Sequence, residues 1–256
     1  MFSIILKPIY KFYEWILQRE VIRGTIPTHI GIIMDGNRRL AENLGIKPWE
    51  GHKLGAEKVA DVLTWCLSLN IKTITAYAFS TENFNRPKEE LEELFDLFEE
   101  YFNKIAKEKK IHDNKIRIKA IGRVDLFPLR VREAIKSAED LTSEYNNSYL
   151  NLAVAYGGRQ EVLDAVKKIA ENVKDGSLEL DSIDEKTIGD NLYTNGSPDP
   201  DLIIRTSGEW RISGFLLWQS AYSELYFCDS YWPLIRKIDF LRAIRAFQRR
   251  KRRFGR

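Results

Sequence analysis

The chain has 256 residues, of which 44% are hydrophobic and 30% are charged, a composition typical of a folded globular protein. Its formal net charge is only +3, which argues against a protein whose whole surface binds nucleic acid, although the last 15 residues hold eight Lys or Arg. Two cysteines far apart in the sequence, Cys66 and Cys228, predict neither a disulfide framework nor a zinc site and fit a reducing cytoplasm. The sequence contains no apolar run of about 18 residues, so it predicts no transmembrane helix.

Residues 1–27 are predicted to form an N-terminal extension ahead of the main domain, residues 28–256. Charged residues interrupt its apolar run and no small-residue cleavage site follows, which argues against a signal peptide. Apolar residues recur there at helical spacing: Phe2, Ile5, Ile9, Phe12, Trp15 and Ile16. The pattern leaves two roles open, a helix that lies on a membrane surface and a helix that packs on the domain or on a partner subunit.

The rest of the chain alternates between predicted strands and predicted helices, in about six β-α units. Buried or half-buried strands are predicted at residues 30–34, 71–80, 115–122, 149–156 and 201–204. Helices are predicted from residue 51, from Pro87 through Ile105, over 126–145, from 159, over 214–222 and over 238–251. This alternation predicts a single α/β domain with a mostly parallel sheet flanked by helices.

The first strand, Ile30–Met34, ends abruptly at the turn Asp35–Asn37, and Arg38 and Arg39 follow it. A strand that stops at a glycine turn and opens a helix leaves free backbone N–H groups at one point, which favours an anion. The two arginines add charge and fork geometry suited to phosphate. The Asp35 carboxylate fits there if a divalent cation bridges it to a diphosphate. The alternative is an ordinary strand-to-helix loop with a solvated aspartate.

Polar side chains also follow two later strands of the predicted sheet. The second strand runs into Ser80, Thr81, Glu82, Asn83 and Arg86, and the strand at 201–204 runs into Arg205, Arg211 and Ser213. Parallel strands place these two loops and the Asp35 turn at the same edge of the sheet, where open α/β sheets bind ligands. This convergence is the strongest physical argument for a phosphate site.

Each of three further features has two possible interpretations. His52, near the start of a helix, could bond a phosphate oxygen or be structural. Glu224 lies among apolar residues and needs a partner there, either an arginine or a metal ion. The apolar stripe of the predicted helix that begins at Pro87 is either core or the wall of a tunnel for a long apolar ligand. The sequence contains no Walker A motif, no G-x-G-x-x-G after a strand and no H-E-x-x-H.

Six segments, taken together, resemble the cis-prenyltransferases, of which undecaprenyl diphosphate synthase is the standard member. They occur in this order: HIGIIMDGNRR, GHKLGAEKV, AYAFSTENFNRP, NLAVAYGGRQE, DLIIRTSGEWRISGFLLWQSAYSELYF and RRFG. The resemblance covers residues 28–256 and implies that they form a catalytic domain. Asn-Arg-Arg after Asp-Gly is similar to the archaeal and eukaryotic branch, and Leu40 stands where bacterial members usually have Trp.

The resemblance implies a six-stranded parallel α/β domain in a homodimer or heteromer. It implies repeated addition of isopentenyl diphosphate, in cis, to an allylic primer such as farnesyl or geranylgeranyl diphosphate, with release of pyrophosphate and growth into a hydrophobic tunnel. The expected product is a medium- or long-chain polyprenyl diphosphate, the precursor of a glycosyl carrier lipid. The expected location is cytoplasmic, with transient contact at a membrane for the product, and no nucleic acid is involved.

The resemblance also implies roles for individual residues. Asp35 is expected to be catalytic and, with Glu224, to bind Mg²⁺. The allylic diphosphate is expected to contact Gly36, Asn37, Arg38, Arg39, Leu40 and His52, and the reacting end Ser80, Thr81, Glu82, Phe84 and Arg86. Isopentenyl diphosphate is expected to contact Arg205, Arg211, Ile212 and Ser213, together with Arg253 and Gly255 from a C-terminal segment that closes over the partner's site. Asn83 is the family's suggested proton acceptor, but a carboxamide is a poor base and pyrophosphate is the alternative.

Two positions depart from the family pattern. Pro48 stands where many bacterial members have an Arg, with Lys47 beside it, and Trp210 stands where some have His.

Two other functions compete with catalysis. A non-catalytic partner subunit of the same fold is the main alternative, yet such subunits typically lose the Asp-Gly-Asn turn that this chain keeps. A nucleic-acid binder that uses the basic tail is the other, and a solvated helix end or attraction to anionic lipid explains the tail more simply.

Overall fold

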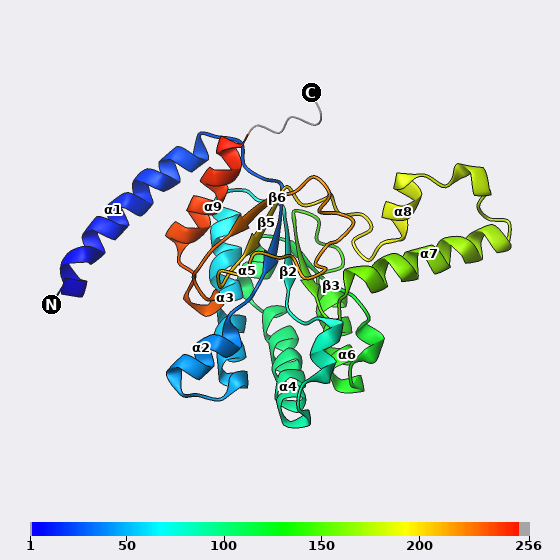
Figure 1. Ribbon diagram of the computed structural model, residues 1–256, viewed down its shortest axis with the longest axis horizontal. Coiled ribbons are helices and arrows are strands. Elements are labelled where there is room, and N and C mark those ends of the chain that lie inside the picture. Colours follow the sequence, from blue (N-terminus) through cyan, green and yellow to red (C-terminus); the bar gives the residue numbers. More distant parts are fainter. Residues whose placement is uncertain (1, 251–256) are drawn as a thin grey trace.

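The computed structural model describes residues 2–250, with side chains from residue 8 onward, and contains one sheet whose six strands all pair in parallel (Figure 1). The strand order is β3-β4-β2-β1-β5-β6. The strands are β1 His29–Ile33, β2 Thr73–Tyr77, β3 Ile116–Ile121, β4 Ser148–Ala153, β5 Leu202–Arg205 and β6 Glu224–Phe227. The predicted α/β class and parallel sheet are therefore confirmed.

Helices connect and flank these strands. They are α1 Phe2–Ile22, α2 Asn37–Leu44, α3 Pro48–Ser68, α4 Lys88–Ile105, α5 Lys109–Asp113, α6 Leu129–Leu141, α7 Gly158–Lys174, α8 Glu185–Asn191 and α9 Lys237–Arg249. Short 3-10 turns lie at η1 Thr81–Asn85, η2 Val124–Leu126, η3 Leu180–Ser182 and η4 Trp232–Leu234. Along the described residues, no helix has both the length and the apolar character needed to cross a bilayer.

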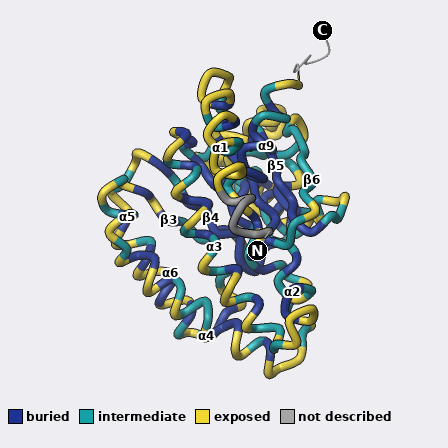
Figure 2. Tube along the Cα trace, turned by 90° about the vertical axis from the view of Figure 1, so that its left-hand side faces the viewer, coloured by how far each residue is buried: buried dark blue, intermediate teal, exposed yellow. Residues whose placement is uncertain are grey.

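The two faces of the sheet bury different partners, because successive side chains of a strand point to opposite faces. Ile30 and Ile32 belong to the larger core, which includes apolar residues of α3, α4, α6 and α9. Ile33 and Ile203 belong to a smaller core on the other face, where Phe215 lies fully buried. Figure 2 shows this buried centre enclosed by helices whose outer sides are exposed.

The order of the strands places a ligand crevice beside β1. The chain passes from β1 to its neighbour β2 on one side, and later enters β5 on the other side of β1. Such a reversal opens a crevice outside the carboxyl ends of the strands. The loops that follow β1, β2 and β5 meet at this edge, as the sequence predicts.

Several predicted elements differ from the structure. Residues 214–222, predicted as a helix, form successive turns, because Ser213, Gly214 and Leu216 have the left-handed φ angles 49°, 74° and 45°. The apolar periodicity also gave no prediction of β6, because a strand of four residues is too short to show an alternating pattern. The helix predicted over 126–145 ends at Leu141, and α3 begins three residues earlier than predicted, with Pro48 in its first turn.

Candidate active site

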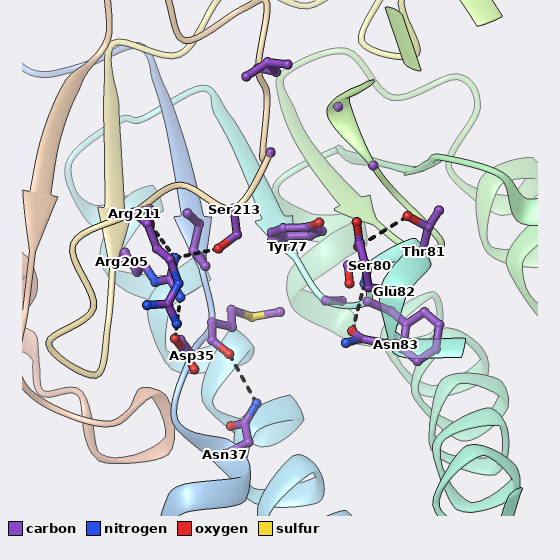
Figure 3. Close-up of a pocket in the computed structure, with 18 of the residues that line it drawn as sticks. Asp35, Asn37, Tyr77, Ser80, Thr81, Glu82, Asn83, Arg205, Arg211 and Ser213 are labelled. Carbon is purple, nitrogen blue, oxygen red and sulfur yellow. Dashed lines mark hydrogen bonds and ion pairs between the residues drawn. The ribbon is translucent and has the colours of Figure 1, made fainter. Parts of the chain in front are cut away.

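A cavity of about 1000 Å³ opens at the carboxyl edge of the sheet. The loops that follow β1, β2, β4 and β5 all line it. Figure 3 shows two groups of polar side chains on opposite sides of Tyr77: Asp35, Arg205, Arg211 and Ser213 on one side and Ser80, Thr81, Glu82 and Asn83 on the other. The sequence prediction that these loops converge is thus confirmed.

Asp35 lies between two arginines at the end of β1. Its Oδ2 is 2.7 Å from Arg205 Nη2, and its Oδ1 is 3.1 Å from Arg39 Nη2. The loop itself is pinned to the neighbouring strand, because the Asp35 N–H donates to Thr206 Oγ1 at 3.0 Å and the Thr206 hydroxyl donates to the Asp35 carbonyl at 2.7 Å. The carboxylate therefore has a fixed position.

The protonation state of Asp35 follows from these contacts. Burial works to raise its pKa, but the hydrogen bonds and charges of Arg205 and Arg39 outweigh burial and hold the pKa below its usual range. Asp35 is therefore a carboxylate at neutral pH, and its two oxygens face cations. Only 25% of its side chain is exposed, so it is accessible from the cavity but screened from bulk solvent.

Arg205 is the buried cation of the site. Its side chain is only 5% exposed, and its Nη1 donates to Ser213 Oγ at 2.9 Å and to the Arg211 carbonyl. Its Nε is buried and has no hydrogen-bond partner among the described residues. A guanidinium held this firmly at the cavity wall is suited to bind a multiply charged anion.

The start of α2 provides backbone donors on the same side. Gly36 caps the helix with a left-handed φ of 104°, and a Cβ there would lie 2.7 Å from the ring of Tyr231. Asn37 opens the helix so close to α3 that a Cβ on Gly51 would lie 2.3 Å from the Asn37 carbonyl oxygen. The first N–H groups of a helix lack helical partners, so this end of α2 favours an anion.

Ser80–Asn83 form a tight polar turn at the end of β2. The Ser80 N–H donates to Asn83 Oδ1 at 2.9 Å, which closes a capping box at the start of η1. Ser80 also forms an isolated bridge with Tyr156, which follows β4. The carboxamide oxygen of Asn83 thus already accepts a backbone hydrogen bond.

A second charged cluster lies on the α3–α4 side of the cavity, around Glu90. This carboxylate is 4% exposed, and its Oε1 lies 3.1 Å from Arg86 Nη1 and 3.4 Å from Arg38 Nε. Arg86 Nη1 also lies 3.0 Å from His52 Nε2. Because a guanidinium only donates, His52 Nε2 must accept, which places the ring proton on Nδ1. Burial lowers the pKa of His52, so the ring is neutral.

Arg39 and Arg211 share one acidic partner at the rim. Arg39 Nη1 lies 2.9 Å from Glu209 Oε1, and Arg211 pairs with the other oxygen of the same carboxylate. The Arg211 side chain is 60% exposed, so it can turn toward a ligand at little cost.

The charge of the cavity wall favours polyanions. The wall holds six arginines, Arg38, Arg39, Arg86, Arg159, Arg205 and Arg211, against only two carboxylates, Asp35 and Glu82. Arginine forks and helix N–H groups are the donors that bind phosphate best. The start of α2 and Arg205 are the two places on this wall where such donors gather.

Sequence reasoning missed two parts of this site. The first is Glu90, although a carboxylate on the apolar stripe of a predicted helix, one turn before Leu94, was a signal of burial. The second is the loop after β4, from which Gly157, Gly158, Arg159 and Gln160 line the cavity. The predicted Gly-Gly turn at the same sheet edge could have identified it.

Some predicted site residues lie outside the cavity wall. Leu40 is buried behind it, Phe84 packs in an aromatic cluster with Phe79, Phe95 and Phe127, and Ile212 packs on the smaller core. Lys47, beside Pro48, is absent from the wall and pairs weakly with exposed Glu89 at 3.8 Å. Trp210 is 81% exposed and stacks on Phe227.

Glu224 lies at the amino ends of the strands, as the first residue of β6, whereas Asp35 follows the carboxyl end of β1. Glu224 pairs in register with Leu202, the first residue of β5, whereas Arg205 at the cavity is the last. Its carboxylate lies 2.5 Å from Arg250 Nη1. Asp35 and Glu224 of one chain therefore cannot bind the same ion. Arg253 and Gly255 lie outside the described residues.

A narrow apolar cavity of about 60 Å³ continues from the main one between the sheet, α3 and α4. Met34, Asn37, His52 and Ala78 line both cavities. The narrow one continues along Val59, Leu94, Leu97, Phe98, Tyr101 and Phe102. A cavity of this size holds a few water molecules and is too small for a long apolar chain. The predicted apolar stripe of α4 thus serves partly as core and partly as a cavity wall.

The residues at Asp35 fit a divalent cation only together with a phosphate ligand. No three acidic, His or Cys side chains gather as a metal site anywhere in the part of the chain that the structure describes. One carboxylate beside cationic donors is nevertheless the donor set with which proteins hold Mg²⁺ on a diphosphate, because phosphate oxygens and waters complete the shell.

Comparisons with known proteins find relatives over nearly the whole chain. A family model described as "Putative undecaprenyl diphosphate synthase" matches residues 33–255. A tritrans,polycis-undecaprenyl-diphosphate synthase (geranylgeranyl-diphosphate specific) from Methanopyrus kandleri is 61% identical over 98% of this chain and 93% of its own length. The protein of the same name from Methanocaldococcus jannaschii is 57% identical over 96% of this chain and 89% of its own length.

Two solved structures share the fold. Lavandulyl diphosphate synthase from Lavandula x intermedia, in complex with dimethylallyl diphosphate, superposes with a TM-score of 0.87 at 37% identity, covering 93% of this chain and all of that one. A probable undecaprenyl diphosphate synthase from Campylobacter jejuni superposes with a TM-score of 0.73 at 32% identity, covering 91% of this chain and all of that one.

Proposed function

Because the chain belongs to the undecaprenyl diphosphate synthase family and is a cis-prenyltransferase, we propose that it repeatedly adds isopentenyl diphosphate to geranylgeranyl diphosphate. The names of the archaeal relatives support this primer over farnesyl diphosphate. The proposed product is an undecaprenyl-length diphosphate that serves as precursor of a glycosyl carrier lipid. The observation that carries the proposal is the single cavity with two groups of phosphate donors, one on each side of Asp35.

The two diphosphates have different proposed sites. The allylic diphosphate lies at the start of α2, on the N–H groups after Gly36 and beside Arg38 and Arg39. Its apolar chain enters the narrow cavity between α3 and α4. Isopentenyl diphosphate lies on Arg205, Arg211 and Ser213. In each cycle the C1–O bond of the allylic substrate breaks, pyrophosphate leaves with the electron pair, and C4 of isopentenyl diphosphate bonds to C1.

The donors act where charge develops. Negative charge grows on the leaving pyrophosphate, and fixed arginines and helix N–H groups stabilise that charge without rearranging. The condensation then releases a proton from C2 of the isopentenyl unit. Asn83 is a weak candidate for the acceptor, because its amide oxygen has little basicity and already accepts the Ser80 N–H. We assign the proton to pyrophosphate and give Asn83 the role of shaping the turn.

Members of this family generally need a divalent metal, and Mg²⁺ is the proposed ion. Asp35 would hold it against the allylic diphosphate. When bound, the ion would neutralise part of the charge on the departing pyrophosphate. Arg39 and Arg205 would then keep the carboxylate aimed at the phosphates.

The proposed active form is a homodimer. Glu224 lies at the other end of the strands from Asp35 and cannot reach it within one chain. A role in metal binding therefore requires the Glu224 of a second copy. The proposed role of Arg253 and Gly255, closing over the partner's site, likewise requires a second copy.

The proposed place of action is the cytoplasm beside a membrane, because both substrates are water-soluble diphosphates whereas the long-chain product is not. Contact with the membrane would be transient.

The test is pyrophosphate release by the purified chain with isopentenyl diphosphate alone and with geranylgeranyl or farnesyl diphosphate added, each with and without EDTA. The proposal predicts release only when both substrates and a divalent ion are present, with a higher kcat/KM for geranylgeranyl diphosphate. Failure to release pyrophosphate with either primer would indicate a non-catalytic partner subunit instead.

A further inference from the structure

Helix α1 presents opposite faces to the protein and to solvent. Leu17 and Val21 are completely buried against the larger core, beside α9. The opposite face carries large apolar side chains in the open: Ile9 is 60% exposed, Phe12 63%, Trp15 48% and Ile16 42%. The predicted packing of this helix on the domain is therefore confirmed for one face. Figure 2 shows the exposed outer side of α1.

The acidic residues of α1 are directed toward α9. Glu14 lies 3.7 Å from Lys237, and Glu20 lies 3.4 Å from Arg245 and 3.2 Å from Arg249. The outer face retains its cations, because Lys11, Arg19 and Arg23 are all exposed. The two acids of α1 are thus paired with cations of α9, and the outer side of α1 is basic.

Positive charge is concentrated at this corner. Residues 8–23 and 236–250, whose side chains the structure describes, contain nine Lys or Arg and three Asp or Glu, a net charge of +6, whereas the whole chain has +3. Residues 24–235 are acidic, with a net charge of −8. Helices α1 and α9 lie side by side, so the two basic segments share one corner of the molecule (Figure 1).

The aromatic side chains of this face lie beside its cations. Phe12 and Trp15 stack with ring centroids 6.0 Å apart, and the Arg19 guanidinium lies 3.9 Å from the centroid of the Trp15 ring. Aromatic rings at headgroup depth, with arginines that extend toward phosphate, are the arrangement of helices that lie in the interface of a bilayer.

We propose that this α1 surface, formed by Ile9, Phe12, Trp15, Ile16 and the cations Lys11, Arg19 and Arg23, binds an anionic lipid bilayer with the helix in the membrane plane. The proposal deepens the proposed function, because an enzyme with a long-chain lipid product would then work where that product is delivered. Two copies of a surface this basic repel one another, which disfavours self-association. A nucleic acid would match the cations but would leave four large apolar side chains in water.

The test is flotation of the full chain with vesicles, without substrates. Wild-type protein should float with phosphatidylglycerol-containing vesicles, float much less with pure phosphatidylcholine, and detach as salt increases. The double variant Phe12→Ser/Ile16→Ser should bind the anionic vesicles at least about tenfold more weakly, since two buried apolar side chains are lost. The matched variant Leu141→Ser/Leu180→Ser removes side chains that are 51% and 66% exposed elsewhere, and should float like wild type.

Three results would overturn the proposal. One is equal flotation of wild type and Phe12→Ser/Ile16→Ser. Another is a change of oligomeric mass in that variant by light scattering, which would assign the surface to a second copy. The third is that the protein binds a duplex oligonucleotide as tightly as it binds vesicles, and that Phe12→Ser/Ile16→Ser does not change this binding. That result would assign the surface to nucleic acid. Chain elongation measured in detergent separates the membrane proposal from the proposed function. If the protein floats with anionic vesicles but does not elongate the substrate, only the proposed function is refuted.

Discussion

Asp35 and Arg205 join the ends of two neighbouring parallel strands, with Asp35 Oδ2 2.7 Å from Arg205 Nη2. Arg205 depends on this contact, because its guanidinium is only 5% exposed and Asp35 is its one acidic partner among the described residues. The pair places an anionic oxygen where six arginines line the wall, so a cation and a diphosphate can both be held there. The predictions below begin with this pair.

Asp35→Asn should lower turnover at least about 100-fold, because the side chain keeps its shape but loses the charge that positions a divalent ion and the arginines. Stability should fall by about 1–3 kcal/mol, since Arg205 loses its counter-charge. The measurement is elongation rate together with urea unfolding. Asp61→Asn changes an exposed acid of α3 and should alter neither. Turnover within twofold of wild type would refute the role of Asp35.

Glu90→Gln should raise KM for the allylic substrate about tenfold, with a smaller effect on kcat. The buried carboxylate orients Arg86 and Arg38 by charge-assisted hydrogen bonds, and a neutral amide orients them less strongly. Steady-state kinetics with each substrate varied in turn measures the effect. Glu89→Gln is the matched control, because the neighbouring side chain is 75% exposed. An unchanged KM in Glu90→Gln would show that the cluster does not shape the allylic site.

Stability should fall as the pH is lowered from about 6.5 to 4, because of His29. This ring is 1% exposed and bonded at 2.6 Å to the Pro198 carbonyl and at 2.8 Å to Thr75, and burial lowers its pKa to about 4. The unfolded chain takes up the proton first, so His29 contributes roughly 3 kcal/mol above pH 6.5 that is lost toward pH 4. Chemical unfolding across this range measures the slope. His29→Gln should flatten it, and an unchanged slope would contradict the assignment.

Tyr101→Ala should shift products to longer chains, because Tyr101 lines the narrow cavity and its buried hydroxyl has no partner among the described residues. Removing the ring opens space at that wall. Chromatography that resolves products by length tests this. Leu126 is 43% exposed in η2 and absent from the cavity wall, so Leu126→Ala should leave product length unchanged. Equal product lengths in Tyr101→Ala and wild type would contradict the prediction.

Local patterns were sufficient to predict the strand that ends at Asp35 and the convergence of three loops. A buried apolar run followed by Asp-Gly-Asn leaves few conformations, and parallel strands bring their carboxyl ends to one edge. The pattern could not give the strand order, in which β4 inserts between β2 and β3, because pairing partners are set by packing of distant segments.

Other features depended on contacts that periodicity does not encode. The stretch after Ser213 has helix-compatible residues, yet its left-handed turns let Gly158 donate to the Gly214 carbonyl at 3.1 Å, and Leu216 is fully buried. Tertiary packing overrides propensity there. Glu224 had the arginine partner that its context required, but that partner, Arg250, lies 26 residues later in the chain.

The most direct test of the central claim is incorporation of labelled isopentenyl diphosphate into extractable products, resolved by length, with geranylgeranyl diphosphate as primer. Wild type with Mg²⁺ should yield a ladder ending at undecaprenyl length, EDTA should abolish it, and Asp35→Asn should reduce it to a trace. A wild-type chain that folds and binds both diphosphates but forms no extended product, with or without Mg²⁺, would contradict the assignment of this cavity as a chain-elongating active site.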